Sequence, residues 1–231
     1  MIPVADNVPA RQFPLGNWLL LASIVLVFLL ELAQGQGLEA FLQRWALVPA
    51  TLTGAVAPAP GAAPPWFTLF SAMFLHAGFA HLIGNALFLY IFGDNVEDAM
   101  GTARYLVFYL VCGLVASFAQ IALDPAGTIP NVGASGAISG VLGAYIVMYP
   151  RATVTVVLPL LVLFPVMHVP ALVMLGLWFF TQFSNGLAAL AVTEATGGVA
   201  WWAHIGGFIA GVLLVSIFRR RPRVRYEHDD G

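Results

Sequence analysis

Two apolar stretches of this chain each contain a polar residue that could take part in nucleophilic catalysis. Ser135 follows glycine and alanine in Gly133-Ala134-Ser135-Gly136 and opens an apolar run, and His204 lies one turn into the last apolar run. Taken alone, the serine could instead be a helix N-cap in a packing motif. A lone histidine in a membrane helix more often forms a hydrogen bond to a neighbouring helix than acts as a base. Placed about 2.6–3.2 Å apart, a hydroxyl and an imidazole would form a nucleophile and its general base.

A second polar pair, His81 and Asn85, is spaced by four residues and therefore shares one face of a helix. Polar side chains inside apolar spans are costly, so they are candidates for function. The pair could direct two hydrogen-bond donors at one point, or it could only join neighbouring helices. A zinc site of His76, His81 and His204 is a further alternative. The H-E-x-x-H signature is absent, so we expect no metal and no cofactor.

Composition places the chain in a membrane. Of 231 residues, 60% are hydrophobic and 9% are charged, against about 25% charged in soluble domains, and the mean hydropathy is +0.89. Such a chain has too little polar surface for a water-soluble globule. The single cysteine, Cys112, cannot form an internal disulfide. We therefore predict an all-α polytopic membrane protein with one membrane domain.

Six apolar runs approach the roughly 20 residues needed to cross a bilayer. They are Asn17–Ala33, Gly78–Phe92, Tyr105–Leu123, Ser135–Met148, Val169–Leu187 and Val199–Phe218. The second and fourth are short, and we expect them to begin below the membrane surface. Residues 152–168 are apolar but contain Pro159 and Pro165. A span there would separate Ser135 from His204 by about 20–30 Å at a rise of 1.5 Å per residue, so we interpret the segment as interfacial or re-entrant on the cytoplasmic side.

Charge sets the predicted orientation. All nine basic residues are arginines, and five follow the last run. By the positive-inside rule both termini are cytoplasmic, and a nucleic-acid-binding tail is the less favoured reading. The predicted parts are a cytoplasmic N-terminus (1–16), a membrane domain (17–218) with an outer loop at 34–66, and a cytoplasmic tail (219–231). In that loop, either a membrane-interface position or ordinary packing fits Phe41, Leu42, Trp45 and Leu47.

Small residues line the two helices that must bring the serine and the histidine together. The fourth run has Gly136 and Gly140 after Gly133, and the sixth has Gly207 and Gly211. Such faces allow close approach of membrane helices. We therefore expect these glycines to pack the fourth helix against the sixth.

The motifs His81-x-x-x-Asn85, Gly133-x-Ser135-Gly136 and Ala203-His204-x-x-Gly207, in this order on six spans, resemble the rhomboid proteases. The resemblance extends from about Trp66 to Phe218 and implies a rhomboid-like bundle whose short fourth helix begins at the nucleophile. There are two departures. Trp66-Phe67 stands where many members have Trp-Arg. Ser139 stands where some have a tyrosine under the histidine ring, which leaves the partner of His204 open.

The resemblance implies an intramembrane serine endopeptidase that cuts transmembrane protein substrates in or next to their spans. Ser135 and His204 would form a dyad, with oxyanion stabilisation from His81, Asn85 and the Ser135 backbone N–H. No acidic residue is placed to orient His204, so we expect modest turnover. The site would face the outer side of a bacterial inner membrane, and the oligomeric state is left open. The main alternative is a non-catalytic rhomboid-like binder; a channel or transporter is disfavoured because no charged residue lies mid-span.

Overall fold

The structure is a computed structural model and describes residues 1–160, 163–190 and 199–220. Three of the nine arginines, Arg221, Arg223 and Arg225, lie outside this part, as does Glu194, an acidic residue that is not expected to orient His204. The elements in chain order are β1 (Ile2–Asp6), α1 (Leu15–Ala33), η1 (Gly35–Gly37), α2 (Leu38–Trp45), α3 (Pro49–Leu52), α4 (Pro65–Ser71), η2 (Ala72–Phe74), α5 (Phe79–Met100), α6 (Thr102–Leu123), α7 (Ser135–Met148), β2 (Thr153–Val157), β3 (Val166–Pro170), α8 (Ala171–Leu190) and α9 (Trp201–Phe218).

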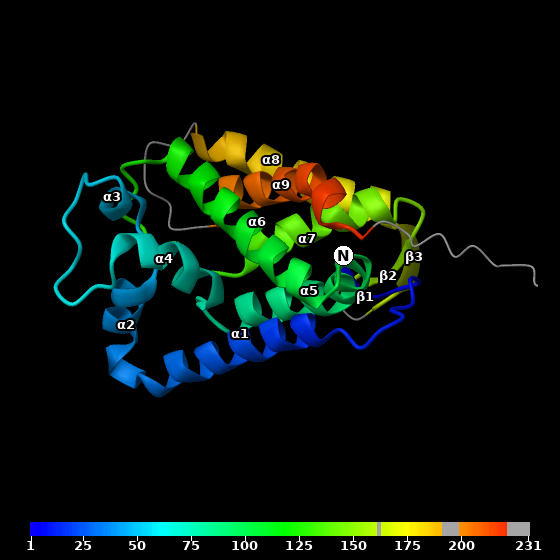
Figure 1. Cartoon of the computed structure of the whole chain (residues 1–231), viewed down its shortest axis with the longest axis horizontal. Helices are drawn as coiled ribbons and strands as arrows, with labels where there is room; N and C mark the ends of the chain where they lie inside the picture. The colour runs from blue at the N-terminus through cyan, green and yellow to red at the C-terminus, as the bar shows by residue number, and fades with distance from the viewer. Residues whose placement is uncertain (161–162, 191–198, 221–231) are drawn as a thin grey trace, which may run out of the picture.

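The long helices run along the long axis of the molecule, with a small sheet at one end and α2, α3 and α4 at the other (Figure 1). Each of the six predicted runs coincides with one of the helices α1, α5, α6, α7, α8 and α9. The prediction of an all-α polytopic membrane fold is confirmed.

Helix length and hydropathy support four or five membrane spans among the described residues. Four described helices, α1, α6, α8 and α9, have the length and hydropathy of a membrane span. A fifth is added if α4–η2 and α5, which meet at a bend of 79°, count as one broken span. Helix α7 has 14 residues and is about 21 Å long at 1.5 Å per residue, shorter than the roughly 30 Å hydrocarbon layer. A count of six stays a prediction.

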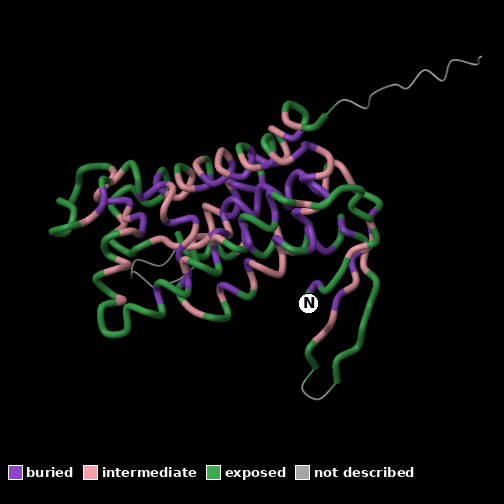
Figure 2. Tube along the Cα trace, turned by 60° about the horizontal axis from the view of Figure 1, so that its bottom comes forward, coloured by how far each residue is buried: buried purple, intermediate pink, exposed green. Residues whose placement is uncertain are grey.

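Helix α7 is the centre of the bundle. Every residue from Gly136 to Tyr145 is buried, and the buried stretches of the chain, purple in Figure 2, lie in the interior of the bundle. Both α6 and α9 pack along it. A helix enclosed on all sides can be short, because protein rather than lipid surrounds its ends.

A buried carboxylate joins α1 to α5 and α6 at the end of the bundle where the sheet lies. Glu97 accepts hydrogen bonds from the backbone N–H groups of Gly16 and Asn17 at 2.9 and 2.7 Å, and from the Thr102 hydroxyl at 2.6 Å. These two N–H groups belong to the first turn of α1, where amides have no helical acceptor and attract negative charge. Glu97 therefore fixes where α1 begins.

A second buried carboxylate lies at the opposite end of α1. Glu31 is 1% exposed, and its two oxygens accept from the His76 backbone N–H at 3.0 and 3.3 Å. This contact holds the short segment that precedes α5, and with it the start of the helix that contains His81 and Asn85.

Strands β2 and β3 pair antiparallel, and the N-terminal strand β1 pairs antiparallel with β2, which gives a three-stranded sheet in the order β1-β2-β3. Val154 and Val156 are buried, while the alternating residues Thr153, Thr155 and Val157 are half-buried, as expected for one covered face of a strand. The sheet lies at one end of the bundle (Figure 1). The interpretation of residues 152–168 as interfacial or re-entrant on the cytoplasmic side stays a prediction.

The first strand is also held by a side-chain contact. The Tyr145 hydroxyl of α7 donates to the Asp6 carboxylate. Burial raises the pKa of Asp6 above its usual value, and the Tyr145 hydrogen bond partly opposes that rise. The first six residues are thus part of the folded unit.

The predicted outer loop, residues 34–66, contains α2 and α3 and packs on the segment that precedes α7. Leu47 exchanges two backbone hydrogen bonds with Asn131, at 3.1 and 2.7 Å, and the Ala50 N–H donates to the Gly127 carbonyl at 3.0 Å. Leu47 is buried, which favours ordinary packing for that residue; Phe41, Leu42 and Trp45 are half-buried. The loop therefore braces the chain just before Ser135.

Candidate active site

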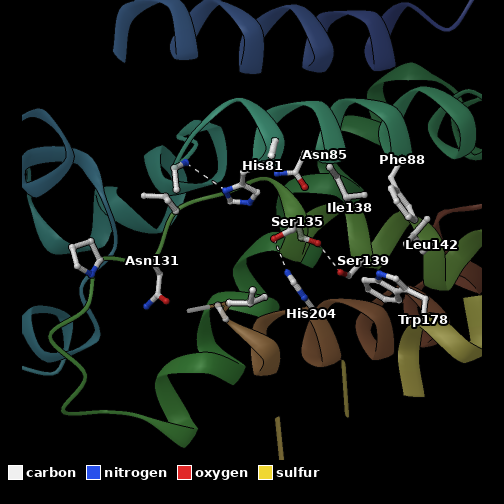
Figure 3. Close-up of a pocket in the computed structure, with 17 residues that line it drawn as sticks. His81, Asn85, Phe88, Asn131, Ser135, Ile138, Ser139, Leu142, Trp178 and His204 are labelled. Carbon is white, nitrogen blue, oxygen red and sulfur yellow. Dashed lines mark hydrogen bonds between the residues drawn. The ribbon is translucent and has the colours of Figure 1, made fainter. Parts of the chain in front are cut away.

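Ser135 and His204 lie within hydrogen-bonding distance. Ser135 is the first residue of α7, and His204 lies in the first turn of α9. Their Oγ and Nε2 atoms are 2.7 Å apart (Figure 3). The N-cap of α7 is Ala134, so the alternative that Ser135 serves as an N-cap is wrong. The hydroxyl instead points at the imidazole.

Glycines on α7 and α9 make this approach possible. A Cβ on Gly207 would lie 2.0 Å from the Gly136 carbonyl oxygen, and one on Gly211 would lie 1.9 Å from that of Gly140. On the other side of α7, a Cβ on Gly140 would meet the Cys112 side chain of α6 at 2.4 Å. Any side chain at these glycines would push the helices apart and carry the serine away from the histidine.

Gly133 has a different role from the one predicted for it. Its φ is +128°, a region that side-chain-bearing residues rarely adopt, and a Cβ there would lie 2.7 Å from the His81 ring. Its N–H donates to the Ala72 carbonyl at 2.8 Å. Gly133 therefore makes room for an imidazole beside Ser135 rather than for a neighbouring helix.

His81 and Asn85 lie on α5 and line the same cavity as Ser135 and His204 (Figure 3). Asn85 is 7% exposed, and its Nδ2 group has no hydrogen-bond partner among the residues that the structure describes. A buried amide donor without a partner costs stability. Its position in the cavity wall makes it available to a ligand.

The cavity has a volume of about 640 Å³. Its walls come from α5, α7, α8, the residues 130–132 before α7 and the start of α9. Apart from the polar groups around Ser135, the lining is mostly alanine, valine, leucine, isoleucine and phenylalanine. Such a space accepts an apolar peptide segment more readily than a charged one.

Helix α8 supplies two neighbours of the His204 ring that the sequence did not reveal. Gln182 is 8% exposed, and its Oε1 lies 2.7 Å from His204 Nδ1. One turn earlier, the Trp178 ring lies 6.0 Å from the imidazole, centroid to centroid, at an interplanar angle of 36°. Trp178 therefore packs on the His204 ring, the role that a tyrosine at position 139 has in some family members. The Ser139 hydroxyl instead donates to the Ser135 carbonyl.

The 169–187 run contains Trp178, Phe179 and Phe183, which could line a path for the substrate or face lipid, and from the sequence we expect most of them to face lipid. Phe183 does lie exposed, at 40%. Trp178 instead lines the cavity, and Phe179 packs against Phe208 of α9 at 4.8 Å. The expectation is wrong for these two, because the 169–187 run is apolar on every face and its hydropathy does not show which side meets α9.

The three-histidine alternative can be compared with the geometry. The His76 and His81 rings lie edge to face, 5.1 Å apart, and His76 Nδ1 faces the Phe74 carbonyl at 3.1 Å. Among the described residues, no group of three or more His, Cys, Asp or Glu side chains is arranged to hold a metal ion.

The sequence is similar to a known family and to several named proteins. Residues 63–221 match the family described as "Rhomboid domain". The chain is 36% identical over 83 residues to the putative rhomboid protease YdcA of Bacillus subtilis, covering 36% of this chain and 41% of that protein. It is 43% identical over 79 residues to the rhomboid protease GluP of the same organism, covering 34% and 15%.

A longer match is to RHOMBOID-like protein 1 of Arabidopsis thaliana, with 31% identity over 168 residues, covering 68% of this chain and 36% of that protein. In each of these three matches the chain spans less than half of the relative's length.

Proposed function

Since this chain belongs to the rhomboid family, we propose that it is an intramembrane serine endopeptidase with Ser135 as nucleophile and His204 as general base. The observation that supports this most directly is the 2.7 Å contact between Ser135 Oγ and His204 Nε2. A serine hydroxyl is a weak nucleophile until a base accepts its proton. Here the base is buried and held against it.

The reaction would proceed in two stages. As Ser135 Oγ attacks the scissile carbonyl carbon, His204 Nε2 takes the hydroxyl proton and then transfers it to the leaving amine, which breaks the C–N bond. A water molecule then attacks the acyl-enzyme ester, gives a proton to His204, and the proton returns to Ser135. The products are a carboxylate and an amine, and no cofactor is consumed.

The tetrahedral intermediate carries a negative oxygen that needs fixed donors. Asn85 Nδ2 supplies one, because it is buried in the cavity wall and no group in the described part of the chain accepts its hydrogen. The His81 ring and the Ser135 N–H, a first-turn amide with no helical acceptor, are the others. The positive end of the α7 dipole lies at the same point.

Asn85→Ala is expected to lower the rate of cleavage about 100-fold, the lower end of what one oxyanion donor contributes. Because no described residue forms a hydrogen bond with Asn85 Nδ2, the thermal unfolding midpoint in detergent should change little. Asn131→Ala is the matched control, since Asn131 lines the same cavity and is held by its backbone. Equal rates for Asn85→Ala and the wild type would remove Asn85 from the oxyanion site.

The substrates we propose are single-span membrane proteins. The cavity is largely apolar and opens between helices of a multi-pass membrane protein. A protease binds an extended backbone, and helix-breaking glycine or proline near the cut would expose the carbonyls that a helix hides. The arginine distribution favours cytoplasmic termini, which puts the active site near the outer face of a bacterial inner membrane.

The test is cleavage of such a substrate by the purified protein in proteoliposomes. We expect two fragments whose new termini, read by mass spectrometry, fall in or next to the transmembrane segment. Replacing the glycine and proline residues near the cut by leucine should slow cleavage. A substrate that co-purifies with the protein but stays intact would favour a non-catalytic binder instead.

A further inference from the structure

Gln182 is the only described side chain besides Ser135 that hydrogen-bonds to the His204 ring. It lies in the middle of α8, 8% exposed, with Oε1 2.7 Å from Nδ1. Its own Nε2 reaches the Thr181 hydroxyl at 3.4 Å, so the amide oxygen is the group that faces the ring. A buried amide in an apolar helix needs such a partner, because an unpaired one is costly.

The direction of this hydrogen bond determines where the imidazole proton lies. A carboxamide oxygen only accepts, so Nδ1 must carry the hydrogen. In a neutral imidazole the other nitrogen, Nε2, then has the free lone pair. That nitrogen is the one 2.7 Å from Ser135 Oγ, and only a lone pair there can take the serine proton.

Helix α8 is itself fixed against α9 along the stripe that contains Gln182. Trp178, one turn before, packs on the imidazole. Gly186, one turn after, also faces α9, where a Cβ would be in ordinary contact with Ile205 and Trp201 at 3.4 Å. Positions 178, 182 and 186 share one helical face, so the amide oxygen is held in place from both sides.

From this geometry we propose that Gln182 is a positioning residue that holds His204 in the Nδ1–H tautomer, and so keeps Nε2 ready to accept the proton of Ser135. The proposal rests on the proposed function for its consequence in catalysis. The tautomer itself is a property of the resting protein and can be measured without substrate. Gln182 thereby occupies the place that an aspartate has in a Ser-His-Asp triad, with a neutral acceptor in place of a carboxylate.

The first readout is the ¹⁵N spectrum of histidine-labelled protein, in which the ring signals of His204 are those lost in His204→Ala. We expect a protonated Nδ1 and an unprotonated Nε2 in the wild type, and loss of that preference in Gln182→Leu, which removes the acceptor at similar volume. An unchanged tautomer in Gln182→Leu would overturn the proposal, whether or not the protein cleaves anything.

The second readout is kinetic. Gln182→Leu should lower kcat about tenfold, the factor associated with loss of one hydrogen bond, with KM little changed. Gln182→Glu keeps the acceptor and should retain activity at alkaline pH, while the acidic limb of its pH–rate profile moves to higher pH because a carboxylate favours the protonated ring. Asn185→Leu is the control, because it makes the same amide-to-leucine change at an exposed position of the same helix, and it should behave like the wild type.

The protease function and the positioning role of Gln182 can each fail without the other. If the wild type shows the Nδ1–H tautomer and Gln182→Leu loses it, but the wild type cleaves no substrate and reacts with no serine probe, the proposed function fails and the positioning role of Gln182 stands. If Gln182→Leu cleaves at the wild-type rate, or if Gln182→Glu shows no shift of the acidic limb, the positioning role fails and the protease assignment stands. Gln182→Glu also serves if Gln182→Leu does not fold.

Discussion

Ser135→Ala is expected to reduce the cleavage of a transmembrane substrate by a factor of about 10³ or more, as removal of a serine nucleophile does in other serine proteases. The physical reason is that no other described hydroxyl lies against His204 Nε2. His204→Ala should lose a similar factor, and the double variant should lose little more, because the two groups act as one unit. Cleavage is followed by gel analysis in proteoliposomes.

Ser139→Ala is the matched control. Ser139 lies one turn further along α7, and its hydroxyl donates to the Ser135 carbonyl at 2.6 Å, away from the imidazole. It should retain most of the wild-type rate. A Ser135→Ala protein that still cuts, or a Ser139→Ala protein that is equally inactive while folded, would contradict the assignment of the nucleophile.

Gly211→Ala is expected to destabilise the protein and to abolish most of its activity. The added Cβ would lie 1.9 Å from the Gly140 carbonyl oxygen, a backbone atom that cannot rotate away. Overpacking of this kind typically costs about 1–3 kcal/mol. Relief requires α9 to move away from α7, which also takes His204 away from Ser135. The free energy of unfolding in detergent and the cleavage rate should therefore fall together.

Gly176→Ala provides the comparison for the same chemical change. Gly176 lies on α8, and a Cβ there meets nothing within 4 Å. An alanine in a helix interior is intrinsically better than glycine by roughly 0.5–1 kcal/mol, so this variant should be at least as stable as the wild type and equally active. If Gly211→Ala unfolds at the wild-type temperature, the close contact between α7 and α9 is not what the structure indicates.

The positions of the long helices could be predicted from the sequence, because in a membrane protein hydropathy and helix formation coincide. The predicted runs Tyr105–Leu123 and Ser135–Met148 match α6 and α7 to within three residues. The run from Gly78 stopped at Phe92, whereas α5 continues to Met100. Its last turns contain Asp94, Glu97 and Asp98, which end a hydropathy signal but do not end a helix.

The sheet could not be predicted in the same way, since β1 and β2 lie about 150 residues apart in the chain. A local signal for β2 did exist. Thr153-Val154-Thr155-Val156 alternates polar and apolar residues with the period of a strand, and Val154 and Val156 are the buried ones. Pro159 and Pro165 argued against a membrane-spanning helix in this segment, but they did not indicate that strands would form on either side of them.

The family and its motif residues could be recognised from the sequence, whereas Gln182 could not. The roles of Ser135, His204, His81 and Asn85 stay predictions until they are tested. Gln182 follows Thr181 and precedes Ser184 and Asn185. The sequence therefore does not show which of these polar residues faces His204. Only the arrangement of α8 against α9 singles out the one whose oxygen lies 2.7 Å from the imidazole.

The most direct test of the central claim is to treat the purified protein with a fluorophosphonate and map the adduct by mass spectrometry of peptides. We expect one phosphonylated residue, Ser135, in the wild type, and no adduct in His204→Ala, where the hydroxyl has no base. An adduct on another serine, or undiminished labelling of the protein in Ser135→Ala, would contradict the assignment of Ser135 as the nucleophile.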